Sequence, residues 1–417
     1  MENSKRFDFI PAASLITPVP ASEIAPDIQN ELINRGGERL TPGHADINYP
    51  LVIFVLTGGT EKQILDIYEK RKSIYPNEPL ILIAHNSNNS LPASLEALAK
   101  IHQLKGRGKI IYLDEQNLKQ GFNELEKTIE YLSVYHKIRD TKIGLIGEPS
   151  DWLVASSPLP LIIEQKWGAR VEKIPVENLI EGVGNVKDEE IEKECFDMIN
   201  NAGDVVEPDA KELADVVRVY GALKKIVDKN RFNAVSVRCF DLVTSLKTTG
   251  CFALARLNDE GITAGCEGDL VSTLGMIWLN HFTGKEVWMA NPARIDDAAN
   301  SIWLAHCTVP VKMVSGYKLR SHFESGLGVG IQGKIENGDV TLVRLGGTGL
   351  EMLWAAEGKI TGQGEEENLC RTQVRIKLDK PANAGDLLNN PLGNHILLVK
   401  GRYARQLEEW HSTFITV

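Results

Sequence analysis

The sequence contains no apolar run long enough to cross a membrane and no cluster of basic residues. A membrane-spanning helix needs about 20 consecutive apolar residues, and no hydrophobic stretch approaches that length. The chain has 46 Lys and Arg residues but 56 Asp and Glu residues, which gives a net charge of −10. Because nucleic acids and anionic lipids attract basic surfaces, we expect neither nucleic acid nor membrane as a partner.

The sequence also lacks any Cys-x-x-Cys pair, and its six cysteines are scattered along the chain. A structural zinc knuckle uses that spacing, so none is expected. A reduced, cytoplasmic protein is the simplest interpretation of unpaired cysteines. The 417 residues are 43% hydrophobic and 24% charged, a composition typical of globular proteins. This length predicts about two to four domains.

Strands and helices alternate over the first two thirds of the chain. Apolar, β-branched segments at 51–59, 79–85 and 109–115 are separated by helical segments, and the rhythm resumes at 142–147. This alternation predicts parallel sheets covered on both faces. From about residue 309, strands are separated by Gly, Asn and Asp turns with no helices between them, which predicts an antiparallel barrel or sandwich.

The fold class is therefore α/β, with two doubly wound Rossmann-like units followed by a β-rich, antiparallel, barrel-like C-terminal domain. We divide the chain into an N-terminal arm and α/β domain at 1–140, a central α/β domain at 141–290 and a β-rich domain at 291–417. Residues 1–48 are Pro-rich and weakly periodic. They predict a leading arm that packs on a neighbouring subunit.

Ligands of open α/β sheets bind beyond the carboxyl ends of the strands. The TGGT turn at 57–60 lies at such an end, but it lacks a complete phosphate-binding motif, so a plain turn is the favoured interpretation. In AGCEGDL (264–270), Asp269 is well placed to cap the following helix. Glu267 is not needed for capping, and function and structure are equally good interpretations of it.

Two of the nine histidines lie where segments meet. His306 lies at the junction between the α/β part and the β-rich part, and His395 opens the strand HILLVKG. A single histidine of this kind is more often a packed side chain than a ligand. Since Glu267, His306 and His395 come from three separate segments, sequence spacing cannot show that they meet.

The segment CEGDLVSTLGMIWLNHFTGKEVWMAN (266–291) resembles the L-fucose isomerase and L-arabinose isomerase superfamily of ketol isomerases. LAHCTVP resembles the superfamily segment with a metal-binding histidine, and GNHILLVKGRYARQLEEW resembles its last histidine-bearing strand and helix. The resemblance is specific over about 230–310 and 390–415. It implies a sugar isomerase whose first domain determines substrate specificity.

Carried over to this chain, the resemblance implies metal ligands at Glu267, His306 and His395. Asn291 falls where the superfamily has its second acidic ligand, 24 residues after Glu267. An amide oxygen can bind a hard cation but cannot accept a proton near neutral pH. Glu267 is then the implied ligand and proton carrier. Three candidates remain open for the second proton transfer: Asp269, Asp296 and a metal-bound water.

The resemblance implies interconversion of an aldose and a ketose through a cis-enediol. Oxygen and imidazole ligands suit a divalent metal, with Mn²⁺ favoured. The implied partner is a small sugar or sugar derivative, and the implied assembly is a homo-oligomer, a trimer or hexamer. Two alternatives remain open: another metal-assisted carbohydrate reaction, such as epimerisation or carbon–carbon bond chemistry, and a non-catalytic sugar-binding regulator.

Overall fold

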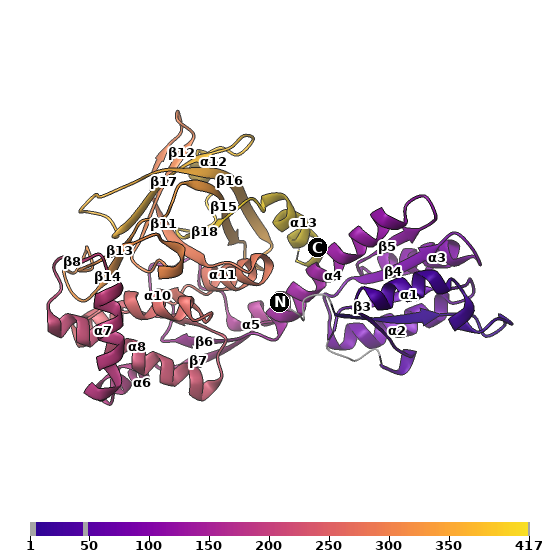
Figure 1. Cartoon of the computed structure of the whole chain (residues 1–417), viewed down its shortest axis with the longest axis horizontal. Helices are drawn as coiled ribbons and strands as arrows, with labels where there is room; N and C mark the ends of the chain where they lie inside the picture. The colour runs from indigo at the N-terminus through magenta and orange to yellow at the C-terminus, as the bar shows by residue number, and fades with distance from the viewer. Residues whose placement is uncertain (1–5, 45–48, 416–417) are drawn as a thin grey trace. The chain divides into compact units, whose positions relative to one another are not determined.

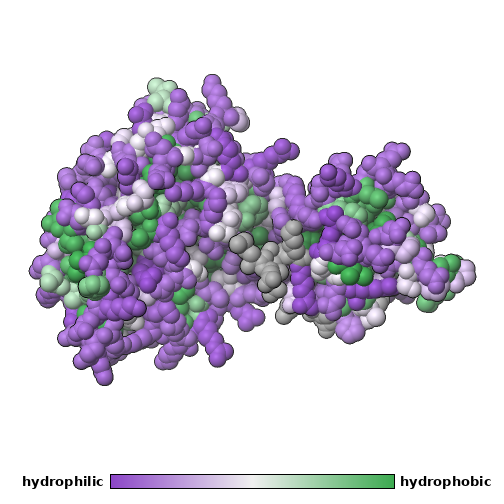
Figure 2. Space-filling view, viewed as in Figure 1, coloured by the Kyte–Doolittle hydropathy of each residue, from purple (hydrophilic) through white to green (hydrophobic). Residues whose placement is uncertain are grey.

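The computed structural model describes residues 6–44 and 49–415 and divides the chain into two compact units (Figure 1). The first unit comprises residues 1–137 with 412–417, and the second comprises residues 138–411. No helix in the described ranges is both long enough and apolar enough to span a membrane. The face shown in Figure 2 is mostly hydrophilic, as expected from the high content of charged residues.

The first unit is built on a five-stranded parallel sheet in the order β2-β1-β3-β4-β5. Its strands are β1 (Phe7–Ala12), β2 (Gly37–Arg39), β3 (Leu51–Val55), β4 (Leu80–His85) and β5 (Gly108–Leu113). Its helices are α1 (Pro26–Asn34), α2 (Glu61–Ile74), α3 (Ser90–Gln103) and most of α4 (Leu118–Arg139). All residues of β3 and β4 are buried, because helices cover the apolar strands.

The prediction of an N-terminal arm is wrong for the described part of 1–48. Strand β1 lies inside the sheet, paired with β2 on one side and with β3 on the other. The arm prediction for residues 1–5 and 45–48 lies outside the described residues. The segment is short and interrupted by prolines, but β1 gains both pairing partners from elsewhere in the chain.

The second unit begins with a four-stranded parallel sheet in the order β10-β9-β6-β7. Its strands are β6 (Lys142–Ile146), β7 (Arg170–Ile174), β9 (Ala234–Val237) and β10 (Thr263–Cys266). The accompanying helices are α5 (Pro160–Lys166), α6 (Val176–Gly184), α7 (Asp188–Asn201), α8 (Ala210–Asn230), α9 (Phe240–Leu246), α10 (Cys251–Asp259) and α11 (Leu270–Thr283).

A closed antiparallel barrel completes the second unit, in the order β11-β12-β17-β16-β15-β18. Its strands are β11 (Val287–Asp296), β12 (Ser301–His306), β15 (Gly338–Gly346), β16 (Met352–Gln363), β17 (Thr372–Leu378) and β18 (Ile396–Lys400). The fold class predicted from the sequence is confirmed: parallel α/β units precede a β-rich barrel. An additional sheet consists of the short strands β8 (Asp204–Val205), β13 (Tyr317–Arg320) and β14 (Gly330–Gly333). Two helices flank β18 in sequence: the short α12 (Asp386–Asn389) precedes it and α13 (Ala404–Phe414) follows it.

Helix α11 joins the parallel sheet to the barrel within the second unit (Figure 1). Its first ten residues, 270–279, are all buried, because the helix contacts β9 and β10 on one side and β11, β15 and β18 on the other. Asp269 caps its first turn by accepting a hydrogen bond from the Ser272 amide. The division at residue 291 between a central and a β-rich domain remains a prediction, since both parts belong to one compact unit.

Candidate metal centre

Three side chains from separate elements of the second unit meet at one point. Glu267 directly follows β10, His306 ends β12 and His395 precedes β18. One potential ligand atom from each lies within 4.8 Å of the others, and all three residues are buried. The structure thus brings together the three charged or imidazole ligands that the sequence resemblance implies.

The backbone of Glu267 lies in the left-handed region, with φ of +63°. A non-glycine residue rarely adopts this conformation, and surrounding contacts must hold it there. The Glu267 carbonyl accepts a hydrogen bond from the Ser150 amide at 2.9 Å, and the Gly268 amide donates to the Val237 carbonyl at 3.0 Å. These bonds, to the loop after β6 and to the end of β9, hold the backbone that directs the Glu267 carboxylate toward the two histidines.

Trp152 is a further residue of the site that sequence reasoning missed. Its Nε1 donates a 2.6 Å hydrogen bond to Oε2 of Glu267. The half-exposed indole packs edge-on against Phe240, with ring centroids 5.0 Å apart. Trp152 lies in the loop that follows β6, at the carboxyl edge of the same parallel sheet as Glu267, and that position was the available signal.

His395 has one ring nitrogen that is engaged and one that is not. Its Nδ1 lies 2.8 Å from Oδ2 of Asp269. Its Nε2 is buried without a hydrogen-bond partner among the described residues, and lies 3.6 Å from Oε1 of Glu267. A buried polar atom without a partner is costly, and a metal ion bound by Nε2 would satisfy it. The donor set therefore fits a metal.

His306 presents its ring to His395, with centroids 5.7 Å apart. Its Nδ1 lies 2.9 Å from the hydroxyl of Thr308, which leaves Nε2 for another partner. Burial and the neighbouring charge of His395 lower the pKa of His306 to about 4. The ring is therefore neutral near pH 7, and neutral imidazole is the form that binds metals.

Asp269 lies behind His395. It accepts hydrogen bonds from the Ser272 amide and hydroxyl, both at 2.7 Å, in addition to its contact with Nδ1 of His395. Burial by itself raises the pKa of Asp269, but the interactions with His395 and with the Arg344 guanidinium outweigh it, so the pKa is lowered. This geometry gives Asp269 an orienting role toward His395, while the proton-transfer role stays a prediction.

Glu267 and His395 each stabilise the charged form of the other side chain. Burial raises the pKa of the Glu267 carboxyl, but the His395 ring and the Trp152 hydrogen bond outweigh it and lower the pKa. For His395, burial lowers the pKa, but Asp269 and Glu267 raise it to about 9. In the absence of metal, the site therefore holds a proton on His395 near pH 7.

Asn291 is half-buried in β11, between the strands that lead to the two histidines. It pairs with Ala305, the residue before His306. Its neighbour Ala290 pairs with Ile396, the residue after His395. Asn291 is therefore close to both ligand-bearing segments, and its role as a ligand stays a prediction. Asp296, at the other end of the same strand, lies roughly 16 Å further along it.

In the first unit, the TGGT turn bonds mainly within itself and to adjacent loops. The Thr60 hydroxyl donates to the Thr57 carbonyl at 2.9 Å, and the Gly58 amide donates to the Asn88 carbonyl at 2.7 Å. The Thr57 hydroxyl accepts from the Ser14 amide at 2.8 Å. These bonds are consistent with the plain turn that the sequence favours.

One carboxylate and two imidazoles form a donor set that suits first-row divalent ions such as Mn²⁺. Three protein ligands also leave coordination positions open for another molecule. The fold and the site together define a class: a protein with parallel α/β units and a C-terminal barrel, whose candidate metal centre lies where the parallel sheet meets the barrel.

Several known proteins are similar in sequence to this chain. Residues 162–279 match the family model of the L-arabinose isomerase central domain. A sulfoquinovose isomerase from Clostridium sp. (strain MSTE9) is 30% identical over 176 residues, covering 42% of this chain and 39% of the relative. Sulfoquinovose isomerases from Alkalicoccus urumqiensis and Priestia megaterium (strain ATCC 12872 / QMB1551) are each 22% identical, covering 66% and 71% of this chain and 63% and 67% of the relatives.

Over the matched residues, this chain is similar to the L-arabinose/L-fucose isomerase-like superfamily. The superfamily resemblance inferred from the sequence is confirmed. The alignments span about 39% and 63% of the length of the first two relatives. The activity of those proteins is therefore a basis for a proposal.

Proposed function

We propose that this protein is a metal-dependent aldose–ketose isomerase that acts on a sugar. The observation that carries the proposal is the unpartnered, buried Nε2 of His395 facing Glu267 and His306. The relatives named sulfoquinovose isomerase support the same reaction class. We further propose that the protein is cytoplasmic and forms a homo-oligomer, a trimer or hexamer. Light scattering would test the oligomeric state.

Glu267, His306 and His395 would hold the divalent ion, with Mn²⁺ favoured and Asn291 as a proposed neutral ligand. A divalent metal at this point supplies electrostatic stabilisation of the negative charge that develops on sugar oxygens O1 and O2. Asp269 and the Thr308 hydroxyl fix the outer nitrogen of each histidine ring, which leaves both Nε2 atoms for the centre.

Glu267 is the proposed proton carrier between C1 and C2 of the sugar. Isomerisation through a cis-enediol requires a base that removes a proton from one carbon and returns it to the other. Trp152 holds one Glu267 oxygen by a hydrogen bond, which fixes the plane of the carboxylate beside the site. Its half-exposed ring also offers an apolar face on which a sugar can pack.

For the substrate, we propose a sulfonated hexose of the sulfoquinovose type. This part of the proposal rests on the names of the relatives. Sulfoquinovose and its unsulfonated analogue should therefore be compared directly, with Mn²⁺ present in both assays. Turnover of the sulfonated sugar alone would support the substrate assignment, whereas turnover of the unsulfonated sugar alone would contradict it.

The decisive experiment combines Mn²⁺ titration with product analysis for the wild type and Glu267→Gln. The amide keeps the shape of the side chain but removes its charge, so Mn²⁺ affinity and isomerisation should both fall sharply. Glu172→Gln is the matched control, because Glu172 is a surface residue of the same unit that pairs with Lys142. Unchanged metal binding and turnover in Glu267→Gln would refute the site.

Product analysis also separates the alternative functions. A ketose product identifies isomerisation, an epimer identifies epimerisation, and shorter fragments identify carbon–carbon bond cleavage. Sugar binding without any turnover in the presence of Mn²⁺ would instead identify a regulator. Each of these last three results would contradict the proposed reaction.

A further inference from the structure

Arg344 is a buried arginine near the C-terminal end of β15, close to the candidate metal centre. Only 1% of its surface is exposed. A buried guanidinium is costly unless its charge and its donors are satisfied. Here Nη1 donates to the Ser272 hydroxyl at 2.7 Å, and also lies 3.6 Å from Oδ2 of Asp269. Arg344 thus compensates the charge of the carboxylate that contacts His395.

The same guanidinium also binds two loops that are distant in sequence. Nη2 donates to the hydroxyl of Ser156, and Nε donates to the Leu392 carbonyl at 3.4 Å. Ser156 lies four residues after Trp152, and Leu392 lies three residues before His395. Arg344 therefore contacts the loop that carries Trp152 and the segment that leads to His395.

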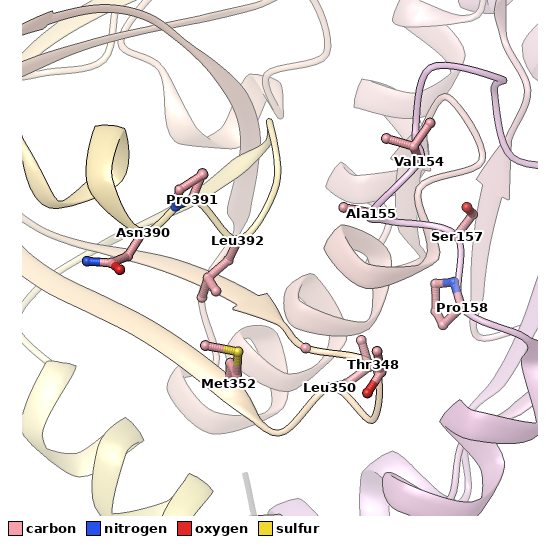
Figure 3. A pocket seen from close by; sticks show the side chains of 11 residues that line it. Val154, Ala155, Ser157, Pro158, Thr348, Leu350, Met352, Asn390, Pro391 and Leu392 are labelled. Carbon is pink, nitrogen blue, oxygen red and sulfur yellow. The ribbon is translucent and has the colours of Figure 1, made fainter.

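These two loops form opposite walls of a pocket with a volume of about 590 Å³. Figure 3 shows Val154 and Ser157 on one wall, and Asn390 and Leu392 across from them. Arg344 cross-links the two walls through Ser156 and Leu392.

The chain leaves room for this arginine at Gly393. That residue has φ of +145°, and a Cβ added to it would lie 2.1 Å from Nη2 of Arg344. Any larger residue would have to displace the guanidinium or the loop. The absence of a side chain at Gly393 thus provides a second, independent way to perturb Arg344 without changing its charge.

We propose that Arg344 is a positioning residue of the candidate metal centre. It fixes Asp269 behind His395, and so directs Nε2 of His395 toward Glu267 and His306, while it holds both pocket walls to this framework. The inference rests on the metal site of the proposed function. It adds a residue that touches neither the metal nor the sugar.

The test is the Mn²⁺ affinity of the full-length protein, measured from the electron paramagnetic resonance signal of free Mn²⁺. Arg344→Met keeps much of the volume but removes the charge and donors. We expect its affinity to fall roughly 10- to 100-fold, the usual effect of losing a residue that supports a metal ligand. Arg344→Lys should restore part of the affinity, because lysine keeps the charge but cannot span the same donors.

Gly393→Ala should also weaken Mn²⁺ binding, although it leaves every charge in place. Arg402→Met is the control, because Arg402 is a half-exposed residue of the second unit that pairs with Asp339, Glu357 and Asp379. We expect wild-type affinity for that control. The spectrum of bound Mn²⁺ should change in the Arg344 and Gly393 variants alone, since a general loss of stability does not alter the ligand geometry of the molecules that remain folded.

Wild-type Mn²⁺ affinity and spectrum in both Arg344→Lys and Gly393→Ala would overturn the proposal, even if Arg344→Met fails to fold. A wild-type protein that binds no Mn²⁺ would instead refute the metal site itself, and with it the role of Arg344. Weakened binding in Arg402→Met equal to that in Arg344→Met would also overturn the proposal, because the effect would then be nonspecific.

Discussion

The proton held by His395 predicts a steep pH dependence of metal binding. Asp269 and Glu267 outweigh the effect of burial and raise the pKa of His395 to about 9. At pH 7, roughly 99% of metal-free molecules would then carry this proton. A metal ion binds the neutral ring only, so it must displace the proton. We expect apparent Mn²⁺ affinity to rise about tenfold per pH unit below pH 8, and about 50-fold between pH 7 and 9, where the slope levels off.

The other two ligands do not contribute to this slope. The pKa of His306 is lowered to about 4, so the ring is already neutral above pH 5. The pKa of Glu267 is lowered, so its carboxyl is already ionised. In the metal-free protein, the raised pKa of His395 stabilises the fold fully below the unfolded value of about 6.5, and this contribution is lost as the pH rises through 9. Alkaline pH therefore weakens the metal-free fold but strengthens metal binding.

Titration with Mn²⁺ between pH 6.5 and 8.5 measures the slope. Calorimetry in two buffers with different ionisation enthalpies counts the released protons, and we expect about one per bound ion. Asp269→Asn removes a group that raises the pKa of His395, so the slope should level off at a lower pH in that variant. An affinity independent of pH, or binding without proton release, would refute the reasoning.

Three further predictions follow from individual contacts. Asn291→Asp should tighten Mn²⁺ binding, because a carboxylate replaces a neutral amide at a hard cation, and equal affinities in a titration would place Asn291 outside the ligand shell. Trp152→Phe removes the donor to Glu267 but keeps an aromatic ring, so kcat should fall roughly tenfold in a steady-state assay, and an unchanged kcat would show the bond to be dispensable. Gly275→Ala would place a methyl group 2.4 Å from the Leu397 side chain of β18, so it should lower the free energy of unfolding by about 1–3 kcal/mol in a denaturant melt. Gly182→Ala is the control and should be close to neutral, because its methyl group would lie 3.4 Å from the nearest side chain. Equal stabilities of the two variants would contradict the packing argument.

The sequence alone determined the order of structural classes along the chain. Apolar, β-branched segments separated by amphipathic segments predict a sheet whose two faces are covered by helices, because the apolar side chains on both faces must be buried. Strands β3 and β4 are indeed buried throughout. The turn-rich region after residue 309 forms most of the barrel, as expected from short strands separated by turns. The expectation of no helices in this region is wrong at one point, because the four-residue helix α12 lies between β17 and β18. These features follow from the local periodicity of apolar and polar residues, which depends only on residues close together in the sequence.

Local periodicity did not reveal how strands pair. Strand β1 is short and contains Pro11, and it is stabilised by pairing with β2 and with β3. That pairing made the N-terminal arm a wrong prediction. The first barrel strand, β11, begins at Val287, directly after α11, because it pairs with β18 more than a hundred residues later. Hydrogen bonds between distant strands leave no signal in the spacing of either segment.

The candidate site divides in the same way. Glu267 was suggested by its place at a strand end, where a helix cap did not need it, and His306 and His395 by their resemblance to ligand-bearing segments. Only the tertiary structure shows that these three side chains meet. It alone reveals the contacts of Trp152 and Arg344, since a hydrogen bond to Glu267 or a charge beside Asp269 depends on the packing of α11 between sheet and barrel. The sequence determined which chemical groups are present, and long-range packing decided which of them face one another. These contacts form between elements that are far apart along the chain, and the sequence separation of two elements does not give their distance in space.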